Sequence, residues 1–210
     1  MLAVIIDVVS SREHPDQRDL LQGVADAVAA GTVADGGARS AGPTTGDELQ
    51  LLYGDEDLGR TVLDLARLRL RLHLSPPSDR AVAIRAGIGA GEVTDPDDAA
   101  APGQSGSAWW AAREALEWTA TSRKGWPEAS WWFVGPRPGS VQAALLALET
   151  VWHRFDETDL RCAQGLLAGM AATELAAELG VQRSTLSERL HTHGVYGWVR
   201  TLQTWAEESS

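Results

Sequence analysis

The sequence predicts a mixed α+β fold in which a part with strands is followed by a part made only of helices. Up to Val134, short runs with strand-like alternation are separated by runs with helical spacing. From Ser140 onward, apolar residues recur only at helical spacing. We therefore predict one domain over 1–138 and an all-helical domain over 139–210, and a boundary near Phe155 is the alternative if the first long helix belongs with the strands.

The first half of the strand-containing domain is predicted to have three strands around one helix. An apolar run over 1–9 predicts a buried strand, and a helix over about 16–31 follows. A weak Gly-rich strand over 34–44 is expected to pair, through a tight turn at Gly46-Asp47, with a strand over 48–53.

The second half of this domain is predicted to have two helices and two strands. A leucine-rich helix over 58–74 carries interspersed arginines (Arg60, Arg67, Arg69 and Arg71), which we interpret as a solvated face. A strand over 81–90 has one face of very small residues, which lets another backbone or a ligand come close. A tryptophan-rich helix over 108–121 and a short strand over 130–134 complete the domain.

Composition narrows the classes of function. The net charge of −11 over 210 residues argues against a broad, non-specific nucleic-acid binder, because phosphate contacts depend on Lys and Arg. A small DNA-reading module with a local basic face remains compatible with it. No apolar run approaches the ~20 residues that span a bilayer, and no signal peptide is evident. We therefore expect a cytoplasmic protein without a membrane partner, in which the single Cys162 is a buried apolar residue.

Two carboxylates stand where they could meet a cation. Asp7 ends the first predicted strand, and Asp47 lies at the tip of the turn before the strand over 48–53. Strand-end carboxylates that converge commonly hold Mg²⁺ against nucleotide phosphates. The alternatives are that Asp7 caps the following helix and that Asp47 is a turn residue.

Residues 173–190 have the pattern of a DNA-binding helix-turn-helix. Ala176 is small where the second helix crosses the first, and Gly180 suits a left-handed turn between them. The predicted inner core is Leu175, Leu179, Val181, Leu186 and Leu190. The side chains predicted to contact double-stranded DNA are Gln182, Arg183, Ser184, Thr185, Ser187 and Arg189. An ordinary helical hairpin is the alternative.

The remaining C-terminal residues raise two further questions. His191 and His193 have no ligand partner at metal-binding spacing, so we interpret them as surface residues at a helix end. The last helix has one apolar stripe that ends near Trp205. We expect this helix either to pack on the hairpin or to pair with a second subunit. A homodimer is expected, because one hairpin in so acidic a chain supplies few phosphate contacts and symmetric pairing doubles them.

Several of these landmarks together resemble the SatD family. They are Asp7, the turn at 46–48, the Arg-x-Gly-Ile-Gly-x-Gly strand beginning at Arg85, and the Ala-Ala-Arg run ending at Arg113. The same landmarks look like a reduced class III nucleotide cyclase domain. That resemblance implies a ferredoxin-like βαββαβ fold, a Mg²⁺ site at Asp7 and Asp47, and a purine nucleotide bound by these residues and Arg113. Trp109 stands where a cyclase has an asparagine, and an indole does not donate to phosphate oxygens as a carboxamide does.

Two functional hypotheses follow. In the first, a cyclase-like domain binds a purine nucleotide with Mg²⁺ and biases a dimeric helix-turn-helix that regulates transcription. In the second, the chain is a divergent nucleotide cyclase or a related phosphoryl-transfer enzyme with an accessory helical domain. The fused helix-turn-helix and Trp109 favour the regulator hypothesis, whereas the presence of Asp7 and Asp47 keeps the enzyme hypothesis open. A third alternative makes the first domain a dimerisation scaffold.

Overall fold

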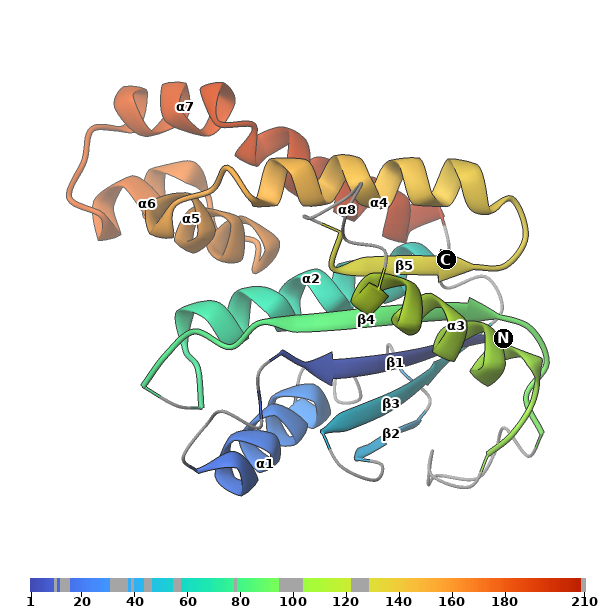
Figure 1. The fold of residues 1–210 in the computed structure, drawn as a ribbon. Helices are drawn as coiled ribbons and strands as arrows, with labels where there is room; N and C mark the ends of the chain where they lie inside the picture. Colours follow the sequence, from blue (N-terminus) through green and yellow to red (C-terminus); the bar gives the residue numbers. More distant parts are fainter. Residues whose placement is uncertain are drawn as a thin grey trace.

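The protein is a mixed α+β molecule, as the sequence predicts. The computed structural model describes residues 1–9, 11, 16–30, 38, 40–43, 47–54, 58–77, 79–94, 104–121 and 129–208. Within those residues the chain forms one five-stranded sheet and eight helices (Figure 1). The predicted turn residue Gly46 and the predicted helix end at Gly31 lie outside the described residues.

The sheet has the spatial strand order β2-β3-β1-β4-β5. β1 (Leu2–Val8) lies at its centre, between β3 (Glu48–Tyr53) and β4 (Ile84–Ala90), and is antiparallel to both. β2 (Ser40–Pro43) pairs antiparallel with β3, as predicted, and β5 (Trp131–Val134) pairs parallel with β4. The register sets Asp7 of β1 opposite Glu48 on one side and Arg85 on the other.

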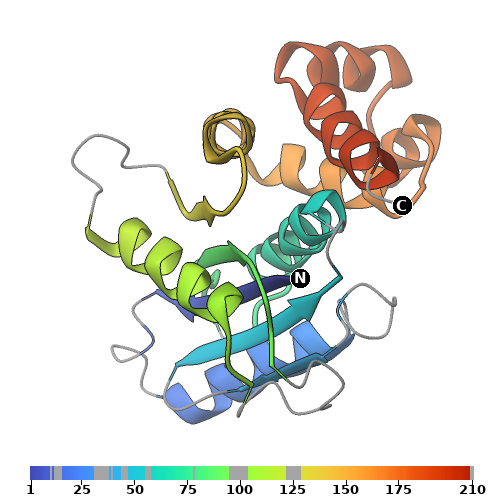
Figure 2. The same ribbon diagram turned by 90° about the vertical axis from the view of Figure 1, so that its right-hand side faces the viewer.

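Helices cover both faces of the sheet. Alternate residues of β1, such as Val4 and Ile6, join the large core that includes α1 (Gln17–Val28) and α2 (Leu58–Leu74). The intervening residues Ala3 and Ile5 pack against α3 (Ser107–Thr121) on the opposite face. Figure 2 shows α3 and α2 on opposite sides of the strands. The functional side chains of β1 at odd positions therefore share the α3 face, because side chains alternate along a strand.

The small face predicted for β4 is filled by backbone. A Cβ atom added at Gly87 would lie 2.1 Å from the carbonyl oxygen of Ala112, and one added at Gly89 would lie 2.2 Å from the Ala112 nitrogen. These distances are far below van der Waals contact, so the two glycines let α3 lie directly on β4. The sequence left open whether another backbone or a ligand lies against this face. The backbone of α3 occupies the space.

Replacing Gly89 by alanine is therefore expected to lower the free energy of unfolding by about 1–3 kcal/mol, because the methyl group forces α3 off the strand. Gly197→Ala is the control, because a Cβ atom there meets no atom within 4 Å. An alanine in the first turn of α8 (Val195–Glu208) should be neutral or stabilising by up to about 1 kcal/mol. Urea unfolding of both variants is the measurement, and a Gly89→Ala protein as stable as wild type would contradict the packing argument.

The C-terminal helices return to the sheet-containing part. α4 (Pro138–Trp152) packs on β5, while α5 (Glu157–Leu167) and α8 pack on α2. Figures 1 and 2 both show α8 beside α2, where a Cβ atom at Gly59 would lie 2.0 Å from the Trp205 carbonyl oxygen. The two parts share one hydrophobic core. The boundary between 138 and 139 falls in the first turn of α4 and stays a prediction.

The predicted solvated face of α2 is wrong for Arg69. This residue is 8% exposed, and its Nη1 donates to Oε1 of Glu149 on α4 at 2.6 Å. Its guanidinium carbon lies 4.2 Å from the ring centre of Trp152 and 5.5 Å from that of Trp131. Burial lowers the pKa of Arg69, and the charge of Glu149 opposes that shift. The reason for the error is that α4, α5 and α8 cover the side of α2 that would otherwise meet water.

Two smaller expectations concern Cys162 and the membrane. Cys162 is buried, as predicted, and burial raises the pKa of its thiol. In the described part of the chain, no helix combines the length and the apolar character needed to cross a membrane.

Candidate functional site

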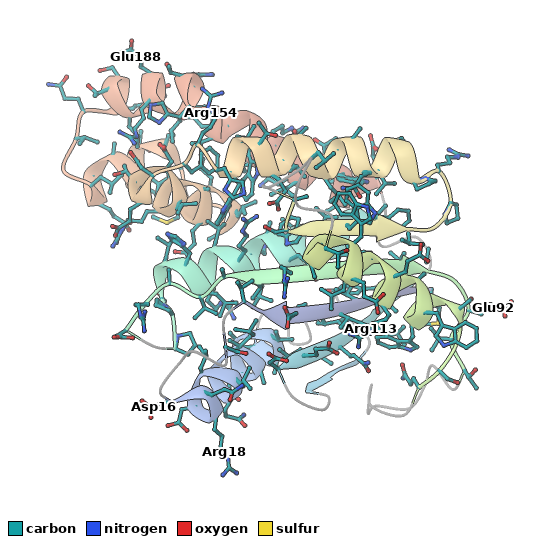
Figure 3. The ribbon with its side chains drawn as sticks, viewed as in Figure 1. Asp16, Arg18, Glu92, Arg113, Arg154 and Glu188 are labelled. Atoms are coloured by element: carbon teal, nitrogen blue, oxygen red, sulfur yellow. The ribbon has the colours of Figure 1, made fainter. Side chains whose placement is uncertain are left out.

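A charged cluster lies on the α3 face of the sheet. It consists of Asp7 on β1, Glu48 on β3, Arg85 on β4 and Arg113 on α3, and we call it the four-residue cluster. The first three residues are direct neighbours across adjacent strands, with Asp7 in the middle. Figure 3 labels Arg113 on α3, which lies in front of the strands in that view. Two carboxylates directly opposite one another repel, so this arrangement needs nearby cations.

The two arginines supply those cations. Arg85 donates to Oδ2 of Asp7 through Nε at 3.0 Å and through Nη2. Arg113 donates to both carboxylate oxygens of Glu48, through Nη1 at 2.5 Å and Nη2 at 2.6 Å. The hydrogen bonds to Glu48 raise the pKa of Arg113, with burial opposing and the charges of Glu48, Glu117 and Asp7 adding to the increase. The four-residue cluster is thus charge-balanced, with each carboxylate bonded to an arginine.

Asp47 has a different partner from Asp7. Its Oδ2 accepts a hydrogen bond from the Ser11 hydroxyl at 2.6 Å, and its backbone oxygen accepts one from the Val8 amide at 3.4 Å. Among the described residues, no group of three or more His, Cys, Asp and Glu side chains is arranged to hold a metal ion. The Mg²⁺ site at Asp7 and Asp47 therefore stays a prediction. Two carboxylates fit a Mg²⁺ ion that keeps most of its waters, which is how this ion usually binds with a nucleotide.

Trp109 and Arg113 lie one helical turn apart on α3. Trp109 is 6% exposed and packs with Ala3 and Ile5. Within the described residues its Nε1 has no hydrogen-bond partner. Its neighbour Trp110 is 75% exposed. The indole of Trp109 thus belongs to the small core beneath α3 and does not accompany Arg113 in the four-residue cluster.

The second candidate site is formed by α6 (Ala172–Glu178) and α7 (Arg183–Thr192). Gly180 has φ +66° between them, the left-handed conformation that the sequence predicts there. Ala176 is buried, and so are Leu175, Leu186 and Leu190 of the predicted inner core, while Leu179 is partly buried. Val181 is 44% exposed, so its predicted core position is wrong. It lies in the turn between the helices, where its side chain points out of the hairpin.

The predicted DNA-contacting residues divide by exposure. Gln182, Arg183, Ser184 and Thr185 at the start of α7 are exposed, and Ser187 is partly buried. Arg189 is also partly buried and donates from Nε to Oδ1 of Asp159 at 2.8 Å and from Nη2 to Asp156. The hydrogen bond to Asp159 contributes most to a raised pKa of Arg189. Arg189 therefore has a role in positioning α7 against α5, and its contact with DNA stays a prediction.

Sequence reasoning missed the partner of Arg189 and His193. Asp159 is fully buried, and its Oδ2 lies 2.8 Å from Nδ1 of His193. It also belongs to a capping box with Asp156 at the start of α5. The local signal was the Asp156-Glu157-Thr158-Asp159 run, but nothing in that run predicts a contact with α7. His191 is exposed, and its ring makes an edge contact with Tyr196.

Comparisons with known proteins find no match: this holds for protein-family models, for curated proteins and for solved structures. The resemblance to the SatD family therefore stays a prediction.

Proposed function

We propose that this protein is a cytoplasmic, DNA-binding transcription regulator in which α6 and α7 form a helix-turn-helix and α7 is the recognition helix. The observation that carries the proposal is the exposed polar start of α7 on a hairpin whose apolar inner side is buried. A small buried Ala176 and a left-handed Gly180 support the crossing of two helices that this motif needs. Side chains at the start of a recognition helix reach base edges in the major groove.

The position of α7 in the molecule supports access to DNA. In Figure 1, α7 lies at the outer edge of the structure, away from the sheet. Arg183 adds a positive charge at the exposed start of the helix in a chain of net charge −11. So acidic a chain is expected to bind DNA through a small local face rather than a broad basic surface.

Selection of duplexes from a random-sequence DNA library tests the proposal directly. The wild-type protein should enrich a common motif and bind it by fluorescence anisotropy more tightly than an unrelated duplex, at a stated salt concentration. Failure to enrich any motif, together with equal affinity for all duplexes, would contradict the proposal.

We further propose that the regulator is a homodimer, because two copies of α7 double the phosphate and base contacts. The motif selected from the library should then contain two related half-sites. Sedimentation should give a dimer at micromolar concentration. A monomer that still binds its selected duplex tightly would rule out this part of the proposal.

For the sheet-containing part, we propose a purine nucleotide with Mg²⁺ as the bound effector. The antiparallel order β2-β3-β1-β4, with α1 and α2 on one face, supports the ferredoxin-like βαββαβ arrangement expected for a cyclase-like domain. Asp7 and Asp47 would hold the Mg²⁺ ion, which neutralises the phosphates. Arg113 would exchange one partner anion, Glu48, for another, a phosphate. The bonds of Asp7 to Arg85 and of Arg113 to Glu48 oppose this binding.

Mg²⁺ with ATP or GTP is therefore expected to raise the melting temperature of the wild type, and the increase should grow with the logarithm of ligand excess. Asp47→Asn should abolish the Mg²⁺-dependent part of the increase, whereas Asp79→Asn, a change of equal charge at an exposed residue, should preserve it. Scanning calorimetry is the measurement. If neither nucleotide raises the melting temperature of the wild type, the effector proposal is wrong. Product analysis of the same mixtures separates the regulator from a residual cyclase.

A further inference from the structure

A cavity of about 640 Å³ lies between α2 and the two helices α5 and α6, away from the four-residue cluster. Its volume falls in the range of pockets that bind small molecules, roughly 300–1,000 Å³. The apolar part of its lining comes from all three helices and from Met170 between α5 and α6. Those apolar residues are Leu70, Leu167, Met170, Leu175 and Leu179.

The charged part of the lining is unusual for so acidic a chain. Three arginines (Arg67, Arg71 and Arg161) and one glutamate, Glu178, line the cavity, which gives a balance of 3 − 1 = +2. Glu157, which pairs with Arg161, reduces the local balance to +2 − 1 = +1. The whole chain carries −11. A concave, partly apolar site with positive charge concentrates anions, because low-dielectric walls focus the field.

The two arginines on α2 bond mainly to backbone. Arg67 donates from Nη2 to the Leu167 carbonyl oxygen at 3.3 Å, and its nearest carboxylate, Asp64, lies 3.9 Å away. Arg71 donates from Nη1 to the Ala27 carbonyl oxygen at 2.9 Å and makes no ion pair within the described residues. A backbone carbonyl does not neutralise a guanidinium. Both arginines therefore retain charge that an anion can satisfy.

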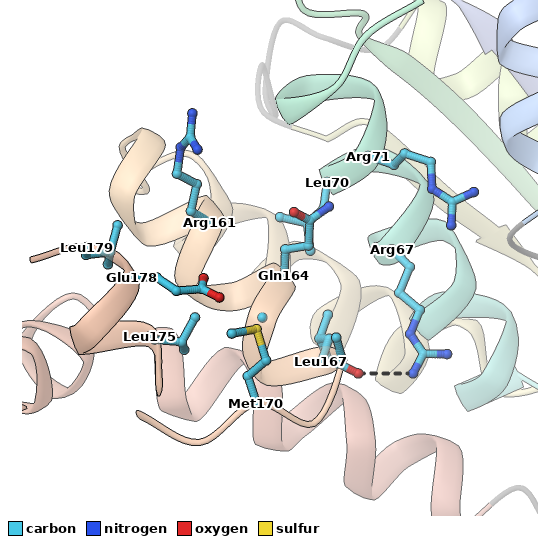
Figure 4. A pocket seen from close by; sticks show the side chains of 12 residues that line it. Arg67, Leu70, Arg71, Arg161, Gln164, Leu167, Met170, Leu175, Glu178 and Leu179 are labelled. Atoms are coloured by element: carbon cyan, nitrogen blue, oxygen red, sulfur yellow. Dashed lines mark hydrogen bonds between the residues drawn. The ribbon is translucent and has the colours of Figure 1, made fainter. Parts of the chain in front are cut away.

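The wall opposite α2 is formed by α5 and α6, and it supplies polar groups and borders the opening of the cavity. Figure 4 shows Gln164 reaching from α5 toward Leu70 of α2, while Arg161 extends from α5 toward solvent. Arg161 is paired with Glu157 at 2.7 Å, so it lies at the mouth rather than at the floor. The packing of α5 against α6 is fixed at Gly165, where a Cβ atom would lie 2.5 Å from Cδ2 of Leu175.

We infer that this cavity is a binding site for a small organic anion with an apolar body, of the class of medium-chain carboxylates. The anionic group pairs with Arg67 at the α2 wall, and Arg71, whose guanidinium is bonded to Ala27 of α1, adds positive charge to that wall. The apolar body lies against the leucines and Met170. This site shares no residue with the proposed nucleotide site or with the exposed start of α7, and its ligand binding does not depend on the DNA-binding proposal.

Three probes with the same eight-carbon body test the inference: octanoate, 1-octanol and octylamine. Calorimetric titration of the full chain should show octanoate binding at least about tenfold more tightly than octanol, and octylamine binding least. Arg67→Gln combined with Arg71→Gln should weaken octanoate binding at least about tenfold and bring it close to that of octanol.

Two variants complete the design. Ala168→Trp places a large side chain in the cavity from the exposed C-terminal end of α5 and should abolish binding of all three probes. Arg18→Gln is the control, because it removes one positive charge at an exposed site on α1 and should bind octanoate as wild type does. Circular dichroism establishes that each variant is folded.

Three results would overturn the inference. They are no octanoate binding by wild type up to about 10 mM, equal binding of octanoate and octanol, or octanoate binding retained in either the arginine double variant or Ala168→Trp. All titrations are done without DNA. Failure here therefore leaves the regulator proposal intact, and failure to select a DNA motif leaves this site intact.

Discussion

Arg69→Met is expected to lower the free energy of unfolding by about 3–5 kcal/mol, because it removes one partner of a buried ion pair and leaves the other charge uncompensated. Glu149 has a side chain that is 1% exposed, and within the described residues its Oε2 accepts no hydrogen bond. The nearby His153 Nε2 lies 3.7 Å from Oε2 and is no substitute for the guanidinium. The two indoles around Arg69 also lose a cation.

A double-mutant cycle separates the charge from the packing. Arg69→Met combined with Glu149→Leu should recover most of the loss, because well-packed apolar residues replace buried ion pairs at little cost. Urea unfolding of the single and double variants is the measurement. If the double variant is as unstable as the sum of the single ones, the loss comes from packing, and the ion-pair argument is wrong.

Arg183→Ala is expected to weaken binding to the selected duplex by about 5- to 150-fold, which corresponds to the loss of one bidentate base contact, about 1–3 kcal/mol. Arg183 is the exposed arginine at the start of α7, and its truncation removes no buried contact. The melting temperature should stay near that of wild type. Fluorescence anisotropy with the selected and an unrelated duplex measures the effect.

Arg18→Ala is the matched control, because it changes the net charge equally on α1, far from α7. It should leave DNA affinity nearly unchanged. Equal losses in the two variants would mean that only net charge matters, and no loss in Arg183→Ala would remove α7 from the DNA interface.

Local patterns predicted most elements of this fold, and tertiary contacts account for the errors. The apolar run of β1 and the small face of β4 are patterns of neighbours close in sequence, so both strands could be predicted. The burial of Arg69 depends on a helix 80 residues away. The exposure of Val181 depends on how the turn leaves the hairpin. No local pattern carries such information.

The candidate sites likewise combine features that the local sequence predicts with features that depend on tertiary contacts. Gly180 could be predicted because a left-handed turn constrains the residue type. Which residues of the four-residue cluster bond to one another depends on the register of three strands and on the position of α3. The local sequence gives neither of these. Glu48 lies next to Asp47 in the predicted turn, yet its bond to Arg113 spans 65 residues. The cavity between α2, α5 and α6 likewise exists only after the helices return to α2.

The packing of α8 on α2 has a consequence for how the protein is made. A ribosome completes α2 long before α8, because about 120 residues separate the two helices in the chain. Domains that finish early usually fold while synthesis continues. Here the apolar side of α2 that α8 covers lacks that cover until α8 has been synthesised. The nascent chain therefore exposes that side until then, and products that terminate before α8 keep it exposed. Such products are expected to be substrates for chaperones and proteases.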